Sequence, residues 1–155
     1  MNSSRRTTLQ VAGAGGIYAA LVTIGLIKPG TAMAADLAAA FKTKGSKATL
    51  EAMGAAGATV SDKVAVLAPD IAENGAVVPV GVKSDLPNTE MIAVLVEKNP
   101  NALTGAYDIP AGTDPEISMR VKMGQSSDVI ALVKADGKFY MATKEVKVTL
   151  GGCGG

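Results

Sequence analysis

The sequence predicts a mainly β protein: an immunoglobulin-like antiparallel β-sandwich of about seven strands, with a short N-terminal helical segment and a flexible C-terminal arm. Three observations support this fold class. Short runs of β-type residues separated by turn residues fill the chain after Asp62. An alanine-rich stretch with apolar residues at helical spacing precedes them. Four glycines around a single cysteine follow the last strand, and glycine leaves the backbone conformationally free.

Residues 1–34 are predicted to be a cleavable export signal. The positively charged start contains Arg5 and Arg6 and no acidic residue, and the stretch 11–27 is apolar or small throughout. It leads to Ala32-Met33-Ala34, a small-residue pattern of the kind that signal peptidases recognise. We therefore expect cleavage between Ala34 and Ala35 and a mature protein in the bacterial periplasm.

Two alternatives concern the fate and the route of this segment. A retained membrane anchor is disfavoured, because a span needs about 20 apolar residues and this run is shorter and rich in glycine and alanine. We expect no stable membrane insertion after cleavage. The paired arginines in Ser4-Arg5-Arg6-Thr7-Thr8-Leu9 resemble the twin-arginine export motif. Thr8 stands where that motif usually has an aromatic residue, whereas Lys28 near the cleavage position fits this route.

The mature chain is expected to form one domain, residues 35–150, followed by an arm, residues 151–155. A chain of 121 residues can bury one ordinary core without disulfides. Cleavage removes three of the 15 basic residues and none of the 14 acidic ones, which leaves a net charge near −2. This balance argues against a nucleic-acid surface, which needs clustered lysine and arginine.

The start of the domain, residues 36–57, is predicted to form one or two short helices. Leu37 and Phe41 lie four positions apart, and Leu50 and Met53 form a second apolar pair at helical spacing. Gly45 lies between the two pairs, so we expect the helical segment to be interrupted near this residue.

Seven strands are predicted after the helical segment. In one stretch Ile117, Met119, Val121 and Met123 alternate with polar residues, and near the end of the domain Val146, Val148 and Leu150 do the same. One buried and one solvated face is typical of an antiparallel strand in a sandwich. The predicted strands are residues 63–68, 76–84, 91–98, 103–109, 116–123, 128–135 and 138–150.

Asp136-Gly137 predicts a β-hairpin between the last two strands. The dipeptide lies between two apolar runs, and both central residues of a type I′ turn need positive φ, which Asp and Gly tolerate. The hairpin would fix the last strand inside the sheet. We therefore expect a rigid strand up to about Leu150, followed directly by the arm.

The arm has the sequence Gly151-Gly152-Cys153-Gly154-Gly155 and contains the only cysteine of the chain. The glycines Gly151, Gly152, Gly154 and Gly155 remove all side chains around the thiol, so the sulfur is unhindered on a flexible tether. Its reach from Leu150 is about 10 Å, at roughly 3.3–3.6 Å for each residue. These properties suit a thiol that enters a narrow pocket on another protein, and we expect Cys153 to carry covalent cargo.

The chain contains little that would activate Cys153 as a catalyst. It has no histidine, so no Cys-His pair can form, and an exposed thiol with a pKa of about 8.5 is only a few per cent thiolate at pH 7. We therefore expect no enzyme activity, no catalytic residue, no metal site and no cofactor. The residues alone leave the cargo open between acyl groups, sulfur and heavy metals.

Other interpretations of the single cysteine also exist. The main alternative is an exported immunoglobulin-like structural or binding module whose Cys153 forms an interchain disulfide, since an odd cysteine in a secreted protein suggests intermolecular pairing or a reactive thiol. An engineered conjugation tag is disfavoured because such a chain would seldom keep an export signal. A prenylation motif is excluded because Cys153 is third from the end rather than fourth.

The sequence resembles the SoxY-type sulfur carrier subunit of the periplasmic thiosulfate-oxidation (Sox) system. The resemblance runs through the mature chain. Its motifs are Pro69-Asp70-Ile71-Ala72-Glu73-Asn74-Gly75, Val78-Pro79-Val80, Glu97-Lys98-Asn99-Pro100-Asn101, Asp136-Gly137, and Val146-Lys147-Val148-Thr149-Leu150 leading into the glycine-flanked Cys153.

The resemblance implies a role and a set of partners. A c-type cytochrome would couple thiosulfate oxidatively to Cys153 and form a thiosulfonate adduct. A hydrolase would then release sulfate, and a sulfur dehydrogenase would oxidise the remaining sulfane sulfur. The carrier would form a heterodimer with a SoxZ-type subunit and would itself catalyse nothing, with a covalent sulfur or thiosulfate adduct in place of a cofactor.

Overall fold

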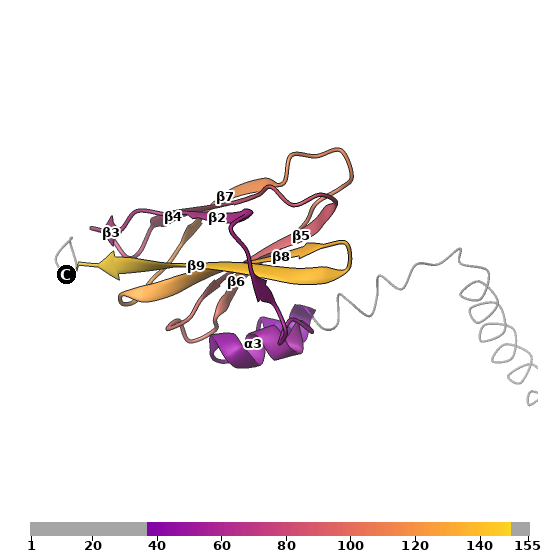
Figure 1. The fold of residues 1–155 in the computed structure, drawn as a ribbon. Coiled ribbons are helices and arrows are strands. Elements are labelled where there is room, and N and C mark those ends of the chain that lie inside the picture. Colours follow the sequence, from indigo (N-terminus) through magenta and orange to yellow (C-terminus); the bar gives the residue numbers. More distant parts are fainter. Residues whose placement is uncertain (1–36, 150–155) are drawn as a thin grey trace, which may run out of the picture. The chain divides into compact units, whose positions relative to one another are not determined.

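The computed structural model describes residues 37–149, which form a β-sandwich with a helical layer on one side (Figure 1). The helical layer consists of one turn at residues 37–40 and helix α3, Ser46–Ala52. The strands are β1 Thr59–Val60, β2 Val64–Leu67, β3 Ile71–Ala72, β4 Val78–Ser84, β5 Thr89–Val96, β6 Leu103–Asp108, β7 Glu116–Val121, β8 Ser127–Ala135 and β9 Lys138–Val148.

Two sheets make up the sandwich. The larger sheet has the strand order β1-β9-β8-β5-β6, with β3 also paired to β9, and the smaller sheet has the order β2-β4-β7. All pairings are antiparallel except those of β1 and β3, which run parallel to β9. The mainly β fold class predicted from the sequence is confirmed.

The main core lies between the two sheets. Alternate residues of each strand point inward, because successive side chains of a strand face opposite sides of the sheet. From β4 these residues include Val78, Val80 and Val82, and they pack against Ile92, Val94 and Val96 of β5 and Val129, Ala131 and Val133 of β8.

A second apolar cluster lies on the other face of the larger sheet, where the helical layer covers β5 and β8. Leu95 and Leu132 are fully buried there, and Leu37, Leu50 and Met53 of the helical layer pack against the same cluster. Figure 1 shows α3 on this side, with the smaller sheet on the opposite side of the larger one. Because β5 and β8 are buried on both faces, their sequences are nearly continuous runs of apolar residues.

The helical segment is interrupted where the sequence predicts it. Gly45 has a φ of +81°, in the region that favours glycine, and its carbonyl accepts hydrogen bonds from the backbone N–H of Thr49 at 3.2 Å and from the Thr49 hydroxyl at 2.7 Å. Of the four predicted apolar residues, Phe41 is the one that stays largely outside the cluster, with 36% of its surface exposed.

The seven predicted strands all exist, and two short ones were not predicted. Strands β1 and β3 have two residues each, too few for any periodicity to be visible, and their parallel pairing comes from long-range contacts. The last strand ends at Val148, while the prediction ran to Leu150, which lies outside the described residues.

The predicted hairpin is confirmed. Asp136 and Gly137 have φ angles of +48° and +71°, and Ala135 pairs with Lys138 across the turn. Asp136 Oδ1 accepts a hydrogen bond of 2.9 Å from the Asn88 side chain. The hairpin fixes the register of β9, and thereby which of its residues lie at the far end of the domain.

Candidate functional site

The predicted attachment site lies outside the described residues. This applies to Cys153 and to the arm glycines Gly151, Gly152, Gly154 and Gly155, and equally to the predicted cleavage site at Ala34 and Ala35. The structure does describe the end of the domain from which the chain continues toward Cys153. The candidate site is therefore built from the last residues of β9, up to Thr149, and from the segments that hold them.

Strand β3 holds the end of β9 on the side away from β8. In the parallel register Ile71 is paired with Lys147, and Ala72 with Val148. The backbone N–H of Lys147 donates to the carbonyl of Asp70 at 2.9 Å, and that of Thr149 donates to the carbonyl of Ala72 at 3.1 Å. The backbone is thus bonded up to the fourth residue before Cys153.

On its other side the end of β9 contacts the loop that precedes β8. The last paired residues of the two strands are Ser127 and Val146. One step further, the backbone N–H of Val148 donates to the hydroxyl oxygen of Ser126 at 2.9 Å. The Ser126 side chain therefore continues the ladder beyond the first residue of β8, so the end of β9 has hydrogen-bond partners on both sides.

Lys144 of β9 binds the segment that precedes β3. Its Nζ lies 3.0 Å from Asp70 Oδ1 and donates a hydrogen bond to the carbonyl of Ala68. The Lys144 side chain is 34% exposed and that of Asp70 is 88% exposed, so solvent screens the ion pair and its contribution to stability is small. Its structural effect is to hold residues 68–70 beside β9.

The turn after β3 explains the Asn-Gly of the Pro69–Gly75 motif. Asn74 Oδ1 accepts a hydrogen bond from the backbone N–H of Ala76 at 2.9 Å, a side-chain turn that asparagine favours. The carbonyl of Gly75 accepts one from the N–H of Met123 at 2.6 Å. A Cβ at position 75 would collide with the carbonyl oxygen of Met123 and lie 2.8 Å from Val148 Cγ1. Only glycine lets this turn pack against the end of β9.

Sequence reasoning did not find these supporting residues. In the sequence, the Pro69–Gly75 motif stands out only through the resemblance and through its turn residues. Its role in holding β9 depends on a contact between residues more than 70 positions apart. Lys144 carries no local signal, because an exposed lysine in an alternating strand normally faces solvent.

A hollow of about 380 Å³ lies at the opposite end of the domain, between the β4–β5 and β6–β7 loops. Asn88 and Glu90 line it, and both form hydrogen bonds to the β8–β9 turn. Strand β9 runs from this turn to Thr149 over about 35 Å at roughly 3.4 Å for each residue. The four residues from Thr149 to Cys153 span at most about 14 Å. The thiol of the same chain therefore cannot reach this hollow.

Within residues 37–149 no group of three histidine, cysteine, aspartate or glutamate side chains is arranged to hold a metal ion. In the same range no helix is long and apolar enough to cross a membrane.

The chain matches the profile of the family described as "Sulfur oxidation protein SoxY" over residues 49–153. Its structure is similar to that of the sulfur carrier protein SoxY from Chlorobium limicola f thiosulfatophilum, with 34% sequence identity and a TM-score of 0.59, covering 68% of this chain and all of the other. Superoxide reductase (neelaredoxin) from Ignicoccus hospitalis shares the fold, with 16% identity and a TM-score of 0.53, over 59% of this chain and 95% of the other. No curated protein sequence matches the chain significantly.

Proposed function

The chain belongs to the SoxY family of sulfur oxidation proteins, and on this premise we propose that it is the covalent sulfur carrier of thiosulfate oxidation, with Cys153 as the attachment point. The observation that carries the proposal is the extent of the family match, which continues through residue 153, the only cysteine of the chain. The geometry supports it: the backbone is held up to Thr149, four residues before Cys153, and the arm itself consists of glycine and the cysteine.

The loading step is an oxidation of two sulfur atoms. The Cys153 thiolate and the outer sulfur of thiosulfate form an S–S bond, and the two electrons released pass one at a time to haem of a c-type cytochrome, each haem accepting one. Water then attacks the terminal sulfone in a hydrolase and releases sulfate and a proton, which leaves a persulfide on Cys153. A sulfur dehydrogenase oxidises that sulfane sulfur. Apart from Cys153, whose sulfur is oxidised in the loading step, the carrier's own residues take no part in the electron or proton transfers.

The remaining parts of the proposal follow from the sequence and, for the partner subunit, from the family resemblance. Residues 1–34 direct export to the periplasm and are cleaved after Ala34, and the mature chain pairs with a SoxZ-type subunit. Gly151, Gly152, Gly154 and Gly155 let the cysteine enter the pockets of the successive enzymes. The absence of histidine from the chain supports a non-catalytic carrier, because no imidazole base is available to the thiol.

Mass spectrometry of the intact exported protein and of its peptides tests the proposal. We expect mass increments of sulfur or thiosulfate size on the peptide that contains Cys153, and we expect reductant to remove them. In the Cys153→Ser variant these increments and thiosulfate-dependent electron transfer to the cytochrome should both be lost, while thermal unfolding stays unchanged.

Two results would contradict the carrier function. One is a Cys153→Ser variant that keeps most of the thiosulfate-dependent activity. The other is a chain found in every preparation only as a disulfide-linked dimer without sulfur adducts, which would support a structural module with an interchain disulfide.

A further inference from the structure

The short distance from Thr149 to Cys153 limits how far any partner can stay from the domain. This inference rests on the proposed function. Four residues span at most about 14 Å even when fully extended, and the depth of a partner's pocket uses up part of that length. An enzyme that receives Cys153 in a pocket must therefore bring the rim of the pocket against the residues around Thr149.

Two pairs of exposed side chains lie at this end of the domain. Ile71 of β3 is the parallel partner of Lys147 of β9, so their side chains leave the same face about 4.8 Å apart. Val77 and Lys122 each lie one residue beyond the paired core residues Val78 and Val121, at the corresponding end of the smaller sheet and on its outer face. The four residues thus flank the end of the sandwich on its two outer faces, and we call Ile71, Val77, Lys122 and Lys147 the exit surface.

The apolar members of the exit surface are unusually exposed. Ile71 has 58% and Val77 49% of its surface exposed, and they are two of the six large apolar side chains described as exposed in residues 37–149. Both are β-branched and sit on backbone held by hydrogen bonds, since the N–H of Val77 donates to the Asn74 carbonyl at 3.3 Å. Rigid apolar side chains lose little conformational entropy when a partner covers them.

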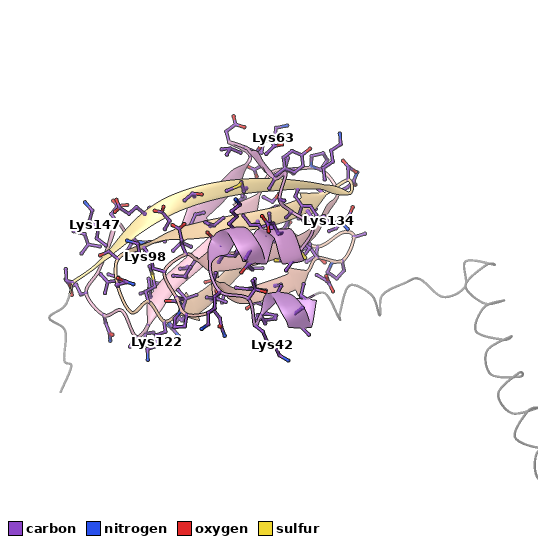
Figure 2. All side chains as sticks on the ribbon, turned by 90° about the horizontal axis from the view of Figure 1, so that it is seen from below. Lys42, Lys63, Lys98, Lys122, Lys134 and Lys147 are labelled. Atoms are coloured by element: carbon purple, nitrogen blue, oxygen red, sulfur yellow. The ribbon has the colours of Figure 1, made fainter. Side chains whose placement is uncertain are left out.

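The charged members of the exit surface are both lysines. Lys147 and Lys122 are exposed, and Lys98 lies in the neighbouring loop, whose Asn99 side chain donates to the carbonyl of Lys122 at 2.7 Å. Figure 2 shows Lys147 at the end of β9, with Lys98 and Lys122 toward the same end and Lys134 toward the other. The exposed acids at the same end are Asp70, Glu73, Glu97 and Glu145, so this end of the domain carries charges of both signs. None of the three lysines forms a described ion pair, whereas Lys83, Lys134 and Lys144 do.

We propose that the exit surface is the common docking surface for the enzymes that act on Cys153, and that it fits an apolar rim around their active-site entrances with acidic groups opposite Lys122 and Lys147. The constraint comes from the length of the chain between Thr149 and Cys153 rather than from the chemistry of one step. It therefore applies alike to the enzyme that loads thiosulfate and to the hydrolase that releases sulfate.

The test compares two double variants of the exported carrier. Ile71→Ser with Lys147→Glu alters the exit surface. Val60→Ser with Lys138→Glu is the matched control, because Val60 is the 76% exposed residue of the other two-residue strand parallel to β9, and Lys138 is an exposed lysine at the opposite end of β9. We expect kcat/KM for both loading and sulfate release to fall about tenfold or more in the first variant and to stay within about twofold in the control.

The remaining readouts separate failure of the surface from failure of the carrier function. Alkylation of Cys153 by iodoacetamide should proceed at the same rate in both variants and in the unaltered protein. Unaltered kinetics of the exit-surface variant, or a loss confined to one of the two reactions, would overturn the common docking surface and leave the carrier function intact. Absence of turnover with the unaltered carrier would instead refute the carrier function itself.

Discussion

Gly75 is the residue whose identity the fold constrains most at the base of the arm. Its constraint is steric rather than conformational, because a Cβ there meets the carbonyl oxygen of Met123 and the Cγ1 of Val148. The contact joins the turn after β3 to the loop before β8 and to β9. A single missing side chain thus allows three segments to meet beside the last described residues of the chain.

Replacement of Gly75 by alanine should destabilise the domain. The added methyl group forces a shift of backbone atoms, so we expect the free energy of unfolding to fall by about 1–3 kcal/mol, as measured by denaturant titration. Gly124→Ala is the control, because Gly124 lies in the neighbouring loop and a Cβ added there would meet no atom within 4 Å. That variant should change stability by less than about 1 kcal/mol. Equal effects of the two substitutions would show that Gly75 is not close-packed in solution.

At the scale of elements, the two-residue strand β3 depends on contacts outside its own ladder. Two parallel pairs are few for a strand, and Lys144 adds contacts with Asp70 and with the Ala68 carbonyl just before β3 begins. The side chain thereby restrains the segment whose carbonyl groups accept hydrogen bonds from Lys147 and Thr149. Order at the end of β9 should respond to this one lysine.

The substitution Lys144→Met tests this dependence, since methionine keeps the length of the side chain but not its charge. We expect the backbone amides of Lys147 and Thr149 to exchange with solvent up to about fivefold faster, in keeping with the small contribution of an exposed ion pair. Hydrogen-exchange NMR measures both amides. Lys134→Met is the control, because it removes the comparable pair with Glu90, 3.4 Å apart, at the other end of the domain. Unchanged exchange at Lys147 and Thr149 in the first variant would contradict the role of Lys144.

The elements differ in how well the sequence predicts them, and the reason is the range of the interactions that form them. The β8–β9 hairpin depends on Asp136 and Gly137 alone, and its turn has the predicted positive φ angles. Strands with clear alternation, such as β7, were predicted with errors of at most two residues at their ends. Strands β1 and β3 exist only through pairing with β9, so no pattern within them indicates a strand.

The residues of the candidate site also divide into those that the sequence alone indicates and those that only the structure reveals. Cys153 and its glycines stand out in the sequence because their composition is rare, and their role remains a prediction. The residues that hold the end of β9, among them Ala72, Gly75 and Lys144, have no signal of their own. Their function is visible only when segments that are distant in the sequence, such as residues 68–75 and the end of β9, are brought together in three dimensions.

For the molecule as a whole, the larger sheet is the layer that joins two apolar clusters. Strand β8 contributes Leu132 to the cluster under the helical layer and Val133 to the core between the sheets, and both side chains are fully buried. A domain whose central strands serve two interfaces should unfold as one unit, because neither interface can open without disturbing the strands that the other needs.

Alanine substitutions on the two faces of β8 test this cooperativity. Leu132→Ala should lower the free energy of unfolding by about 2–5 kcal/mol, and Val133→Ala should lower it by less because about two carbon atoms are removed instead of about three. In both variants circular dichroism of the helix and NMR of the strands should report one coincident transition. Separate melting of the helical layer in Leu132→Ala would show that the layer is an independent unit.

The placement of β9 also determines how the domain bears mechanical force. In the proposed carrier function, an enzyme that retains the cargo while the carrier moves away would apply tension at Thr149, along the axis of β9. The bonds of an antiparallel ladder lie perpendicular to the strands, and β9 has nine paired positions with β8 and two more with β3. Such tension therefore shears many hydrogen bonds at once instead of opening them one after another. Under the proposed carrier function, the domain would therefore resist unfolding when it is pulled through Cys153.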